Sequence, residues 1–275
     1  MMTNTPSILK KIVATKHEEV AIAKQHHTID ELLAVAKTRT MRGFANALRA
    51  VKVADGKIGV IAEIKQASPS KGVICQNFDP VVAAQGYQKA GASCLSVLTD
   101  QMYFLGHDDY LIAARQACTL PVLRKDFMVD EYQIVQSAAI GADCILLIMA
   151  CLDDDTVAKL HHTAITLGLD VLIEIHTQEE LDRALQLPRS SHNIYGINNR
   201  NLNTFEVDLA HSIRLSQHLF EVLGDDALVV SESGLNDAND IHLMQNNGIH
   251  HFLIGEQFMK TDDAGNALHT LLTTI

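Results

Sequence analysis

The sequence predicts an α/β fold, a closed (β/α)8 TIM barrel with a helical N-terminal extension. Eight short apolar runs follow one another from residue 59 to the C-terminus, and segments with helical signals separate them. Residues 58–275 give about 27 residues for each of eight units, which is the length of one βα unit. The runs are apolar throughout rather than alternating, as expected for parallel strands that are covered on both faces. Eight near-equal units of this kind favour closure into a barrel.

Two helices are expected ahead of the first strand. The first is expected over residues 5–26, with Thr5 as its cap, Pro6 at its first position and apolar side chains along one side. Thr28 and Glu31 then have the capping-box spacing, in which a hydroxyl and a carboxylate accept hydrogen bonds from the free amides of a second helix.

The eight expected strands occupy the rest of the chain. In order they are Gly59–Ile64, 91–99, 121–123, 141–149, 168–175, 194–197, 227–230 and 248–255. A glycine opens four of these segments just before an apolar run, which indicates a repeated unit. Helix starts are expected between strands, for example at Asp79 and at Thr177. The expected division is a helical extension, residues 1–50, packed on a catalytic barrel, residues 51–275.

An open, doubly wound sheet is the alternative fold, because it also combines apolar strands with alternating helices. No GxGxxG dinucleotide motif follows the first expected strand. The count of eight near-equal units also favours the barrel over the open sheet.

Composition narrows the function classes. Of 275 residues, 47% are hydrophobic and 20% are charged, which excludes a disordered or collagen-like chain. A net charge of −11 makes binding to nucleic acid or to an anionic membrane unexpected. Five cysteines without a CxxC pair, and no apolar run of signal-peptide or membrane-spanning length, lead us to expect a cytoplasmic location. The histidines show no metal-ligand spacing, so neither a metal nor another cofactor is expected.

Polar residues gather where the expected strands end. Barrels of this kind carry their functional groups at the carboxyl ends of the strands. The residues found there are Glu63, Lys65, Arg124, Lys125, Asp126, Phe127, Glu174, Asn198, Arg200, Ser231, Glu232, Ser233, Gly234, Gly255 and Glu256. This end of the barrel is therefore the expected functional face.

The residue types at this face suit acid–base chemistry on a carbonyl compound. Glu63 and Lys65 are two positions apart, so both are expected to face the barrel interior. An ion-pair network that only plugs the barrel is the structural alternative. Against it, at least two lysines, three glutamates and an asparagine converge, and burial can lower the pKa of a lysine and raise that of a glutamate. The glycines after the last two strands lie where barrels commonly bind phosphate through backbone amides.

Several sequence blocks, in this order, resemble the indole-3-glycerol phosphate synthase family. They are 62–72 (AEIKQASPSKG), 96–100 (SVLTD), 123–127 (LRKDF), Glu174, 196–202 (GINNRNL) and 231–234 (SESG). The resemblance covers nearly the whole chain, including the helical extension. It implies a (β/α)8 barrel that converts 1-(2-carboxyphenylamino)-1-deoxy-D-ribulose 5-phosphate to indole-3-glycerol phosphate, carbon dioxide and water in tryptophan biosynthesis. Ring closure, decarboxylation and dehydration need acids and bases but no redox cofactor.

The resemblance also implies residue roles. Lys125 is implied as the general acid at the carbonyl and Glu174 as the base in dehydration. Lys65, supported by Glu63, is implied to hold the substrate carboxylate, and which lysine serves which proton transfer stays open. The residues implied to orient the anilino and hydroxyl groups are Asn198, Arg200 and Glu232, and those implied around the phosphate are Ser68, Ser233, Gly234, Gly255 and Glu256.

Two features depart from the simplest version of that site. A small hydroxyl residue would suit a phosphate better than Glu256, so the Glu256 backbone amide is expected to donate instead of the side chain. The chain has no Trp, which leaves aromatic contacts with the substrate to Phe104 and Phe127.

The expected partner is a phosphorylated small molecule, with the chain acting as a monomer or in weak association with other enzymes of the pathway. Two alternatives remain. One is another phosphate-binding barrel enzyme, either an isomerase or a Schiff-base aldolase with Lys65 or Lys125 as its nucleophile. The other is a barrel that binds a phosphorylated metabolite without catalysis.

Overall fold

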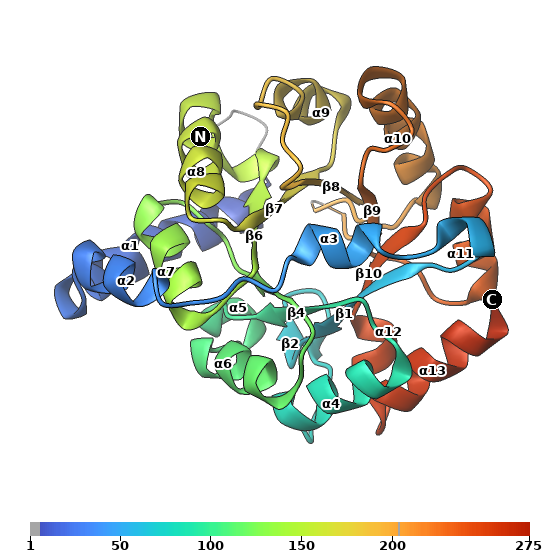
Figure 1. Cartoon of the computed structure of the whole chain (residues 1–275), viewed down its shortest axis with the longest axis horizontal. Helices are drawn as coiled ribbons and strands as arrows, with labels where there is room; N and C mark the ends of the chain where they lie inside the picture. Colours follow the sequence, from blue (N-terminus) through green and yellow to red (C-terminus); the bar gives the residue numbers. More distant parts are fainter. Residues whose placement is uncertain (1–5, 203) are drawn as a thin grey trace.

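A computed structural model describes residues 6–202 and 204–275. Eight parallel strands close into a barrel in the order β1-β10-β9-β8-β7-β6-β5-β4 (Figure 1). They are β1 (Gly59–Ile64), β4 (Cys94–Leu98), β5 (Val122–Lys125), β6 (Cys144–Ile148), β7 (Asp170–Ile175), β8 (Asn193–Asn198), β9 (Val229–Glu232) and β10 (His251–Ile254). Closure is visible at Ala62, which pairs with Leu95 of β4 on one side and Ile254 of β10 on the other. All eight predicted strands and their closure are confirmed.

Helices cover the outside of the barrel (Figure 1). They are α4 (Pro80–Ala90), α6 (Asp108–Ala117), α7 (Glu131–Ile140), α8 (Asp154–Thr166), α9 (Gln178–Ala184), α10 (Leu209–Leu223), α11 (Ala238–Gln245) and α13 (Ala264–Thr274), with the short helices α5 (Gln101–Phe104) and α12 (Glu256–Met259) and the 3-10 turns η1 (Val53–Asp55) and η2 (Met149–Cys151). The predicted helix starts are confirmed, because Asp79 and Thr177 accept hydrogen bonds from the first amides of α4 and α9. In the described part of the chain, no helix is both long and apolar enough to cross a membrane.

The repeated glycine has a local cause. Gly91 and Gly141 end α4 and α7 with φ of +100° and +98°, a left-handed conformation that suits glycine. Each turn reverses the chain into the next strand, and the strand residues that follow are buried throughout. A helix stop, a turn and a strand start are therefore encoded together in each of these units.

Among the described residues, three α-helices precede the barrel: α1 (Ser7–His26), α2 (Ile29–Ala36) and α3 (Phe44–Arg49). The capping box of Thr28 and Glu31 is confirmed at the start of α2. The first helix begins at Ser7, so the prediction that Pro6 is its first residue is wrong; Pro6 is the cap position, and its carbonyl accepts from Lys10. Thr5, the predicted cap, lies outside the described residues.

The extension contacts both ends of the barrel. At the end where the strands begin, the Ala45 amide donates to the Asp170 carboxylate over 2.9 Å, and the ring of His251 bonds the Leu48 carbonyl. Figure 1 shows α3 lying across the middle of the ring of strands, while α1 and α2 lie beside α7. At the opposite end, Lys16 of α1 reaches Asp100 just after β4. The carboxyl end of the barrel is therefore partly walled by α1.

A small hairpin in the β1–α4 loop was not expected from the sequence. It consists of β2 (Ala67–Ser68) and β3 (Gly72–Val73), which pair antiparallel. Two-residue strands are too short to give a hydrophobic period, so no pattern could have predicted them. The hairpin carries Ser68 and Lys71 over the carboxyl ends of the strands.

Candidate active site

One cavity of about 440 Å³ lies at the carboxyl ends of the strands. Every residue with a role implied by the sequence lines it: Glu63, Lys65, Ser68, Phe104, Lys125, Phe127, Glu174, Asn198, Arg200, Glu232, Ser233, Gly234, Gly255 and Glu256. Of the other polar residues expected at this face, Asp126 also lines the cavity, whereas Arg124 and Ser231 are buried outside its lining. These residues come from segments almost 200 positions apart, and the barrel brings them together because its parallel strands all end on one face.

The floor of the cavity holds a lysine between two glutamates. Lys125 Nζ, at the end of β5, lies 3.2 Å from Glu174 Oε2 of β7 and 3.8 Å from Glu232 Oε2 of β9. Asn198, at the end of β8, donates to the other oxygen of Glu174 over 3.3 Å. Both glutamates are buried, with only a few per cent of each side chain exposed. Four strands thus place one cation, two carboxyl groups and an amide in direct contact.

The charge states of this cluster differ from the expectation for lysine. Burial acts against the charged form of Lys125, but the carboxylates of Glu174, Glu232 and Glu63 outweigh it and raise the pKa of the lysine. The predicted lowering of a lysine pKa is therefore wrong for Lys125, which is an ammonium at neutral pH.

The two glutamates around Lys125 diverge in their acidity. Burial and repulsion from Glu174 raise the pKa of Glu232 well above its ordinary value. Burial also acts to raise the pKa of Glu174, but attraction to Lys125 and His176 prevails, so that this pKa is lowered. The lowered pKa keeps Glu174 a carboxylate, which can act as a base, whereas the raised pKa favours the protonated form of Glu232, which can donate a hydrogen bond.

Two glycines make room for these carboxyl groups. A Cβ at Gly196, in the middle of β8, would collide with Glu232 Oε1. A Cβ at Gly255 would lie 2.6 Å from Glu63 Oε1. Gly255 was predicted to allow close approach of a phosphate, whereas the structure shows that its lack of a side chain first accommodates Glu63.

A second lysine lies on the cavity wall at the end of β1. Lys65 Nζ is 2.5 Å from Glu63 Oε1, and Ser96 Oγ of β4 donates to the other oxygen of Glu63 over 3.5 Å. Both charged side chains face the interior, as the alternation along the first strand predicts. Lys125 on the floor and Lys65 on this wall are therefore two separate cations, each with its own carboxylate partner.

The opposite part of the cavity is formed by loops and helix ends. Ser233 and Gly234, after β9, both have left-handed backbone, with φ of +67° and +78°. Such strain at Ser233 is typical of functional positions. Buried Asn199 holds this turn, because its side-chain amide donates to the carbonyls of Glu232 and Ser233.

Glu256 at the start of α12 is neutralised locally. Its two oxygens lie 3.5 Å from Arg200 Nη2 and 3.5 Å from Lys71 Nζ. Lys71 belongs to the hairpin and was not among the predicted site residues, although it stands in the block 62–72 that carries the resemblance. Two cations and one carboxylate therefore stand at this end of the cavity.

An apolar wall completes the cavity. The rings of Phe104 and Phe127 are 6.0 Å apart between centroids, and both line the cavity. Ile8, Leu9 and Ile12 of α1 also line it. Sequence reasoning did not assign these α1 residues to the site, because their spacing reads only as a helix face that packs on something. The wall suits a flat aromatic ring.

Comparisons with known proteins agree with this geometry. The family model described as indole-3-glycerol phosphate synthase matches residues 9–271. Indole-3-glycerol phosphate synthase of Leptothrix cholodnii is 52% identical over 96% of this chain and 98% of its own length. The enzyme of the same name from Chromobacterium violaceum is 49% identical over 96% of this chain and 97% of its own length. The chain belongs to the indole-3-glycerol phosphate synthase family. Its activity is accordingly that of a carboxy-lyase of tryptophan biosynthesis.

Solved structures of low identity share only the fold. A 3-hexulose-6-phosphate synthase superposes with a TM-score of 0.59 at 14% identity, over 79% of this chain and 100% of its own. The tryptophan synthase alpha subunit of Legionella pneumophila gives a TM-score of 0.58 at 14% identity, over 86% of this chain and 100% of its own. Both likenesses support the barrel prediction, and neither bears on the activity of this member of the indole-3-glycerol phosphate synthase family.

Histidines and cysteines do not form a metal centre in the described residues, 6–202 and 204–275, where no three metal-ligand side chains are grouped. His161, for example, bonds Asn193 in the core, and all five cysteines are free thiols. The side chains that this family member offers to a substrate are therefore the acids, bases and cations described above.

Proposed function

We propose that this cavity converts 1-(2-carboxyphenylamino)-1-deoxy-D-ribulose 5-phosphate to indole-3-glycerol phosphate, carbon dioxide and water. The single observation that carries the proposal is the cluster of Lys125, Glu174 and Glu232, where a cation, a carboxylate and a carboxyl group of raised pKa meet in one buried place. Ring closure, decarboxylation and dehydration need this set of proton donors and acceptors.

Lys125 is the proposed acid of the first step. A ring carbon attacks the ketone carbon, and the ketone oxygen takes a proton and becomes a hydroxyl. The raised pKa of Lys125 keeps the proton on its nitrogen until the oxygen becomes basic, and burial strengthens the attraction of its charge for the developing oxyanion. The same raised pKa disfavours the Schiff-base aldolase, because a nucleophilic lysine must be a free amine.

Lys65 is proposed to hold the substrate carboxylate until carbon dioxide leaves. It stands at the end of β1, where Glu63 fixes its position. Departure of carbon dioxide leaves the bonding electrons on the ring, which becomes aromatic again. No transfer of a proton from Lys65 is required for that step.

Glu174 is the proposed base of the last step. The hydroxyl leaves as water with a proton from an acid, and a proton leaves the new ring to Glu174. Its lowered pKa keeps Glu174 ionised, and the amide of Asn198 orients its second oxygen. Glu232 is proposed to donate a hydrogen bond to a substrate hydroxyl. Lys65 and Lys125 are both candidates for the acid that completes the water.

The phosphate is proposed to lie at the end of the cavity formed by the loops after β9 and β10. Backbone amides of Gly234, Gly255 and Glu256 and the hydroxyls of Ser68 and Ser233 are the proposed donors. Arg200, between this end and Asn198, is proposed to orient the middle of the substrate. The anilino ring then lies toward Phe104 and Phe127.

The test is to incubate the protein with the carboxyphenylamino ribulose phosphate in the presence of a chelator and to follow indole absorbance. We expect turnover without added metal or cofactor, and loss of at least ~10²-fold in turnover in Glu174→Gln, which keeps the shape and removes only the base. Activity that disappears with the chelator and returns with a divalent ion would contradict the proposed cofactor independence. Borohydride inactivation with a phosphorylated ketose, without indole formation, would favour the aldolase instead.

The remaining parts of the proposal concern the cellular location and the oligomeric state of the enzyme. Five free thiols fit a reducing cytoplasm. We propose that the chain acts there as a monomer or in weak association with other enzymes of the pathway.

A further inference from the structure

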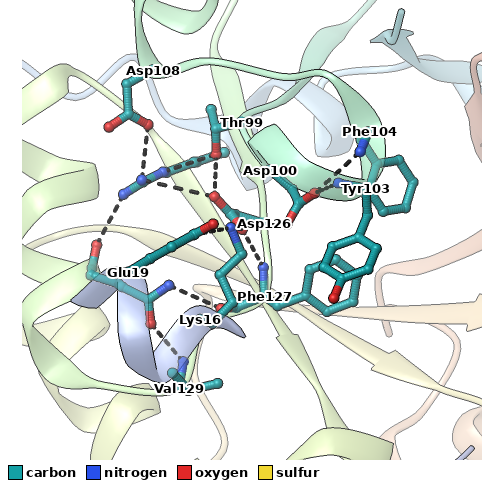
Figure 2. A network of polar contacts seen from close by, with 12 residues as sticks. Lys16, Glu19, Thr99, Asp100, Tyr103, Phe104, Asp108, Asp126, Phe127 and Val129 are labelled. Atoms are coloured by element: carbon teal, nitrogen blue, oxygen red, sulfur yellow. Dashed lines mark hydrogen bonds and ion pairs between the residues drawn. The ribbon is translucent and has the colours of Figure 1, made fainter. Parts of the chain in front are cut away.

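A buried lysine of the N-terminal extension lies against the loops that carry the active site. Lys16 of α1 has only 2% of its surface exposed. Its Nζ lies 2.9 Å from Asp100 Oδ2, 3.0 Å from Asp126 Oδ1 and 2.7 Å from Glu19 Oε2 (Figure 2). Asp100 and Asp126 are themselves buried, and neither is on α1. One ammonium therefore joins the β4–α5 loop to the β5–α7 loop.

The charge is necessary for this arrangement. Burial acts to lower the pKa of Lys16, but the carboxylates of Asp126 and Asp100 outweigh it and raise the pKa. Both aspartates approach the same nitrogen, so loss of its charge would leave two buried carboxylates close together without the cation between them. Arg124 lies beyond them and reaches Asp126 only at 3.9 Å.

Asp100 connects Lys16 to the aromatic wall. Its other oxygen, Oδ1, accepts from the amides of Tyr103 and Phe104 at 2.7 and 3.1 Å, and so caps the short helix α5. Figure 2 shows these two amides converging on Asp100. Thr15, next to Lys16, hydrogen-bonds the Tyr103 hydroxyl over 3.0 Å. The direction in which α5 presents Phe104 to the cavity is therefore set partly from α1.

Asp126 connects Lys16 to the lysine at the cavity floor. It stands between Lys125 and Phe127 in the chain, and its Oδ1 accepts from the Phe127 amide over 2.8 Å. Its Oδ2 accepts from the hydroxyl of Thr99 over 2.6 Å. Lys16 thus fixes a residue whose two neighbours both line the cavity, although Lys16 itself does not line it.

We propose that Lys16 is a positioning residue, which aligns the Phe104 and Phe127 rings and the end of β5 through its contacts with Asp100 and Asp126. It touches no reacting atom and acts only through these two carboxylates. The inference rests on the proposed function, because it assigns catalytic consequences to the placement of Lys125 and of the aromatic wall.

The chain provides a matched control on the same helix and the same loop. Lys24 of α1 pairs with Asp130 of the β5–α7 loop over 2.8 Å, and neither residue lines the cavity. This pair also holds α1 on the barrel, but the Asp130 carboxylate bonds Lys24 and the Tyr132 amide rather than a residue that lines the cavity. If Lys16 only attached the helix, removal of either lysine would have the same kind of effect.

The experiment compares Lys16→Met with Lys24→Met by steady-state kinetics well below the Tm of each variant. For Lys16→Met we expect kcat/KM to fall by ~10- to 100-fold, since a misplacement of about 1 Å is enough for such a loss. Inhibition by inorganic phosphate reports the opposite end of the cavity. It should change by less than about twofold, because the misplacement is confined to the aromatic wall and the end of β5. Lys24→Met should retain wild-type kcat and KM.

A double-mutant cycle tests the route through Asp100. Asp100→Asn keeps an acceptor for the α5 amides and removes the charge, so it should lower kcat/KM less than Lys16→Met does. The double variant should be no worse than Lys16→Met alone, because it removes one of the two carboxylates that the loss of Lys16 leaves uncompensated. If Lys16→Met does not fold, Asp100→Asn alone decides the matter, since wild-type kinetics in that variant contradict the proposal.

The outcomes separate this inference from the proposed function. A wild-type protein that forms no indole refutes the proposed function, whatever the variants do. An active wild type with equal kinetic losses in Lys16→Met and Lys24→Met, or with a lower Tm and unchanged kcat and KM in Lys16→Met, overturns the positioning role and leaves the function intact.

Discussion

The two ends of the barrel both bury charged clusters, but they use them differently. At the end where the strands begin, Asp143 accepts from the amides of Arg42 and Val122 at 2.7 and 2.8 Å, and its second oxygen also pairs with Arg115. At the end where the strands finish, Lys125 and Glu174 open into a cavity. Glu232 Oε1, beside them, has no hydrogen-bond partner among the described residues.

The comparison shows that burial of charge does not by itself identify an active site. The amides that bind Asp143 come from the segment before α3 and from β5, so this carboxylate joins the extension to the barrel. Glu174 instead keeps its charge through Lys125, His176 and the Asn198 amide, and the same cavity that it faces can admit a substrate. What distinguishes the functional end is incomplete pairing next to open volume.

The largest expected effect is at the cavity floor. Lys125→Met should lower turnover by at least ~10²-fold, the usual scale for removal of a positioned acid, while substrate binding stays largely intact. Its Tm should change little, because Glu174 and Glu232 can share a proton once the cation is gone. Steady-state assays that follow indole absorbance measure the loss of turnover. Near-normal turnover with only a raised KM would show that Lys125 binds the substrate without supplying a proton.

The opposite behaviour is expected at the other end. Arg115→Met leaves Asp143 buried without its cation, and breaking such a pair typically costs about 3–5 kcal/mol of stability. Each kcal/mol corresponds to roughly 2–4 °C in Tm for a chain of this size class. Calorimetry should therefore show a clear decrease in Tm, while kcat and KM at low temperature stay at wild-type values. A kinetic loss without a change in Tm would mean that this cluster communicates with the site.

Sequence reasoning succeeded where the cause was local. A helix cap such as Thr28, or a buried run such as Gly59–Ile64, is determined by a few neighbouring residues. The same holds for the placement of Lys125 and Glu174, since any polar residue that ends a barrel strand must lie at one face. Their catalytic roles stay predictions, as does the division of the chain at residue 50.

The failures concern distances between segments far apart in the chain. The pKa of Lys125 depends on how closely strands β1, β7 and β9 bring three carboxylates to it, and no spacing in the sequence contains that information. The contacts of Lys16 depend on where α1 docks. The role of Gly255 likewise depends on the rotamer of Glu63, almost 200 residues earlier.

A smaller effect is expected on the pH dependence of stability, through Glu232 at the cavity floor. Because the folded state raises the pKa of Glu232, this group favours folding below the ordinary carboxyl value of 4.5, and its contribution is lost as the pH rises through the folded value. Glu232→Gln resembles the protonated form at every pH. Its Tm should match that of the wild type near pH 4 and exceed it by a margin that grows as the pH rises above 4.5. An advantage that is largest at acid pH would contradict the raised pKa.

The smallest effect is expected at Glu256, which lies at the functional end but is paired like a structural charge. An unpaired carboxylate ~4 Å from a phosphate would repel it by about 1 to 4 kcal/mol, depending on the local dielectric. The Glu256 side chain is instead 36% exposed and lies between Arg200 and Lys71, so solvent and two cations offset its charge. Glu256→Gln should therefore change inhibition by inorganic phosphate by less than about threefold.

Gly234 makes a contrasting variant at the same end. A Cβ added at Gly234 would collide with the side chain of Val207. Gly234→Asp should abolish phosphate binding, because the left-handed turn and the neighbouring loop must both shift. A gain of tenfold or more in phosphate affinity for Glu256→Gln would mean that its carboxylate competes with the ligand for Arg200 and Lys71. In that case the Glu256 carboxylate would weaken phosphate binding, and the proposed placement of the phosphate would be wrong.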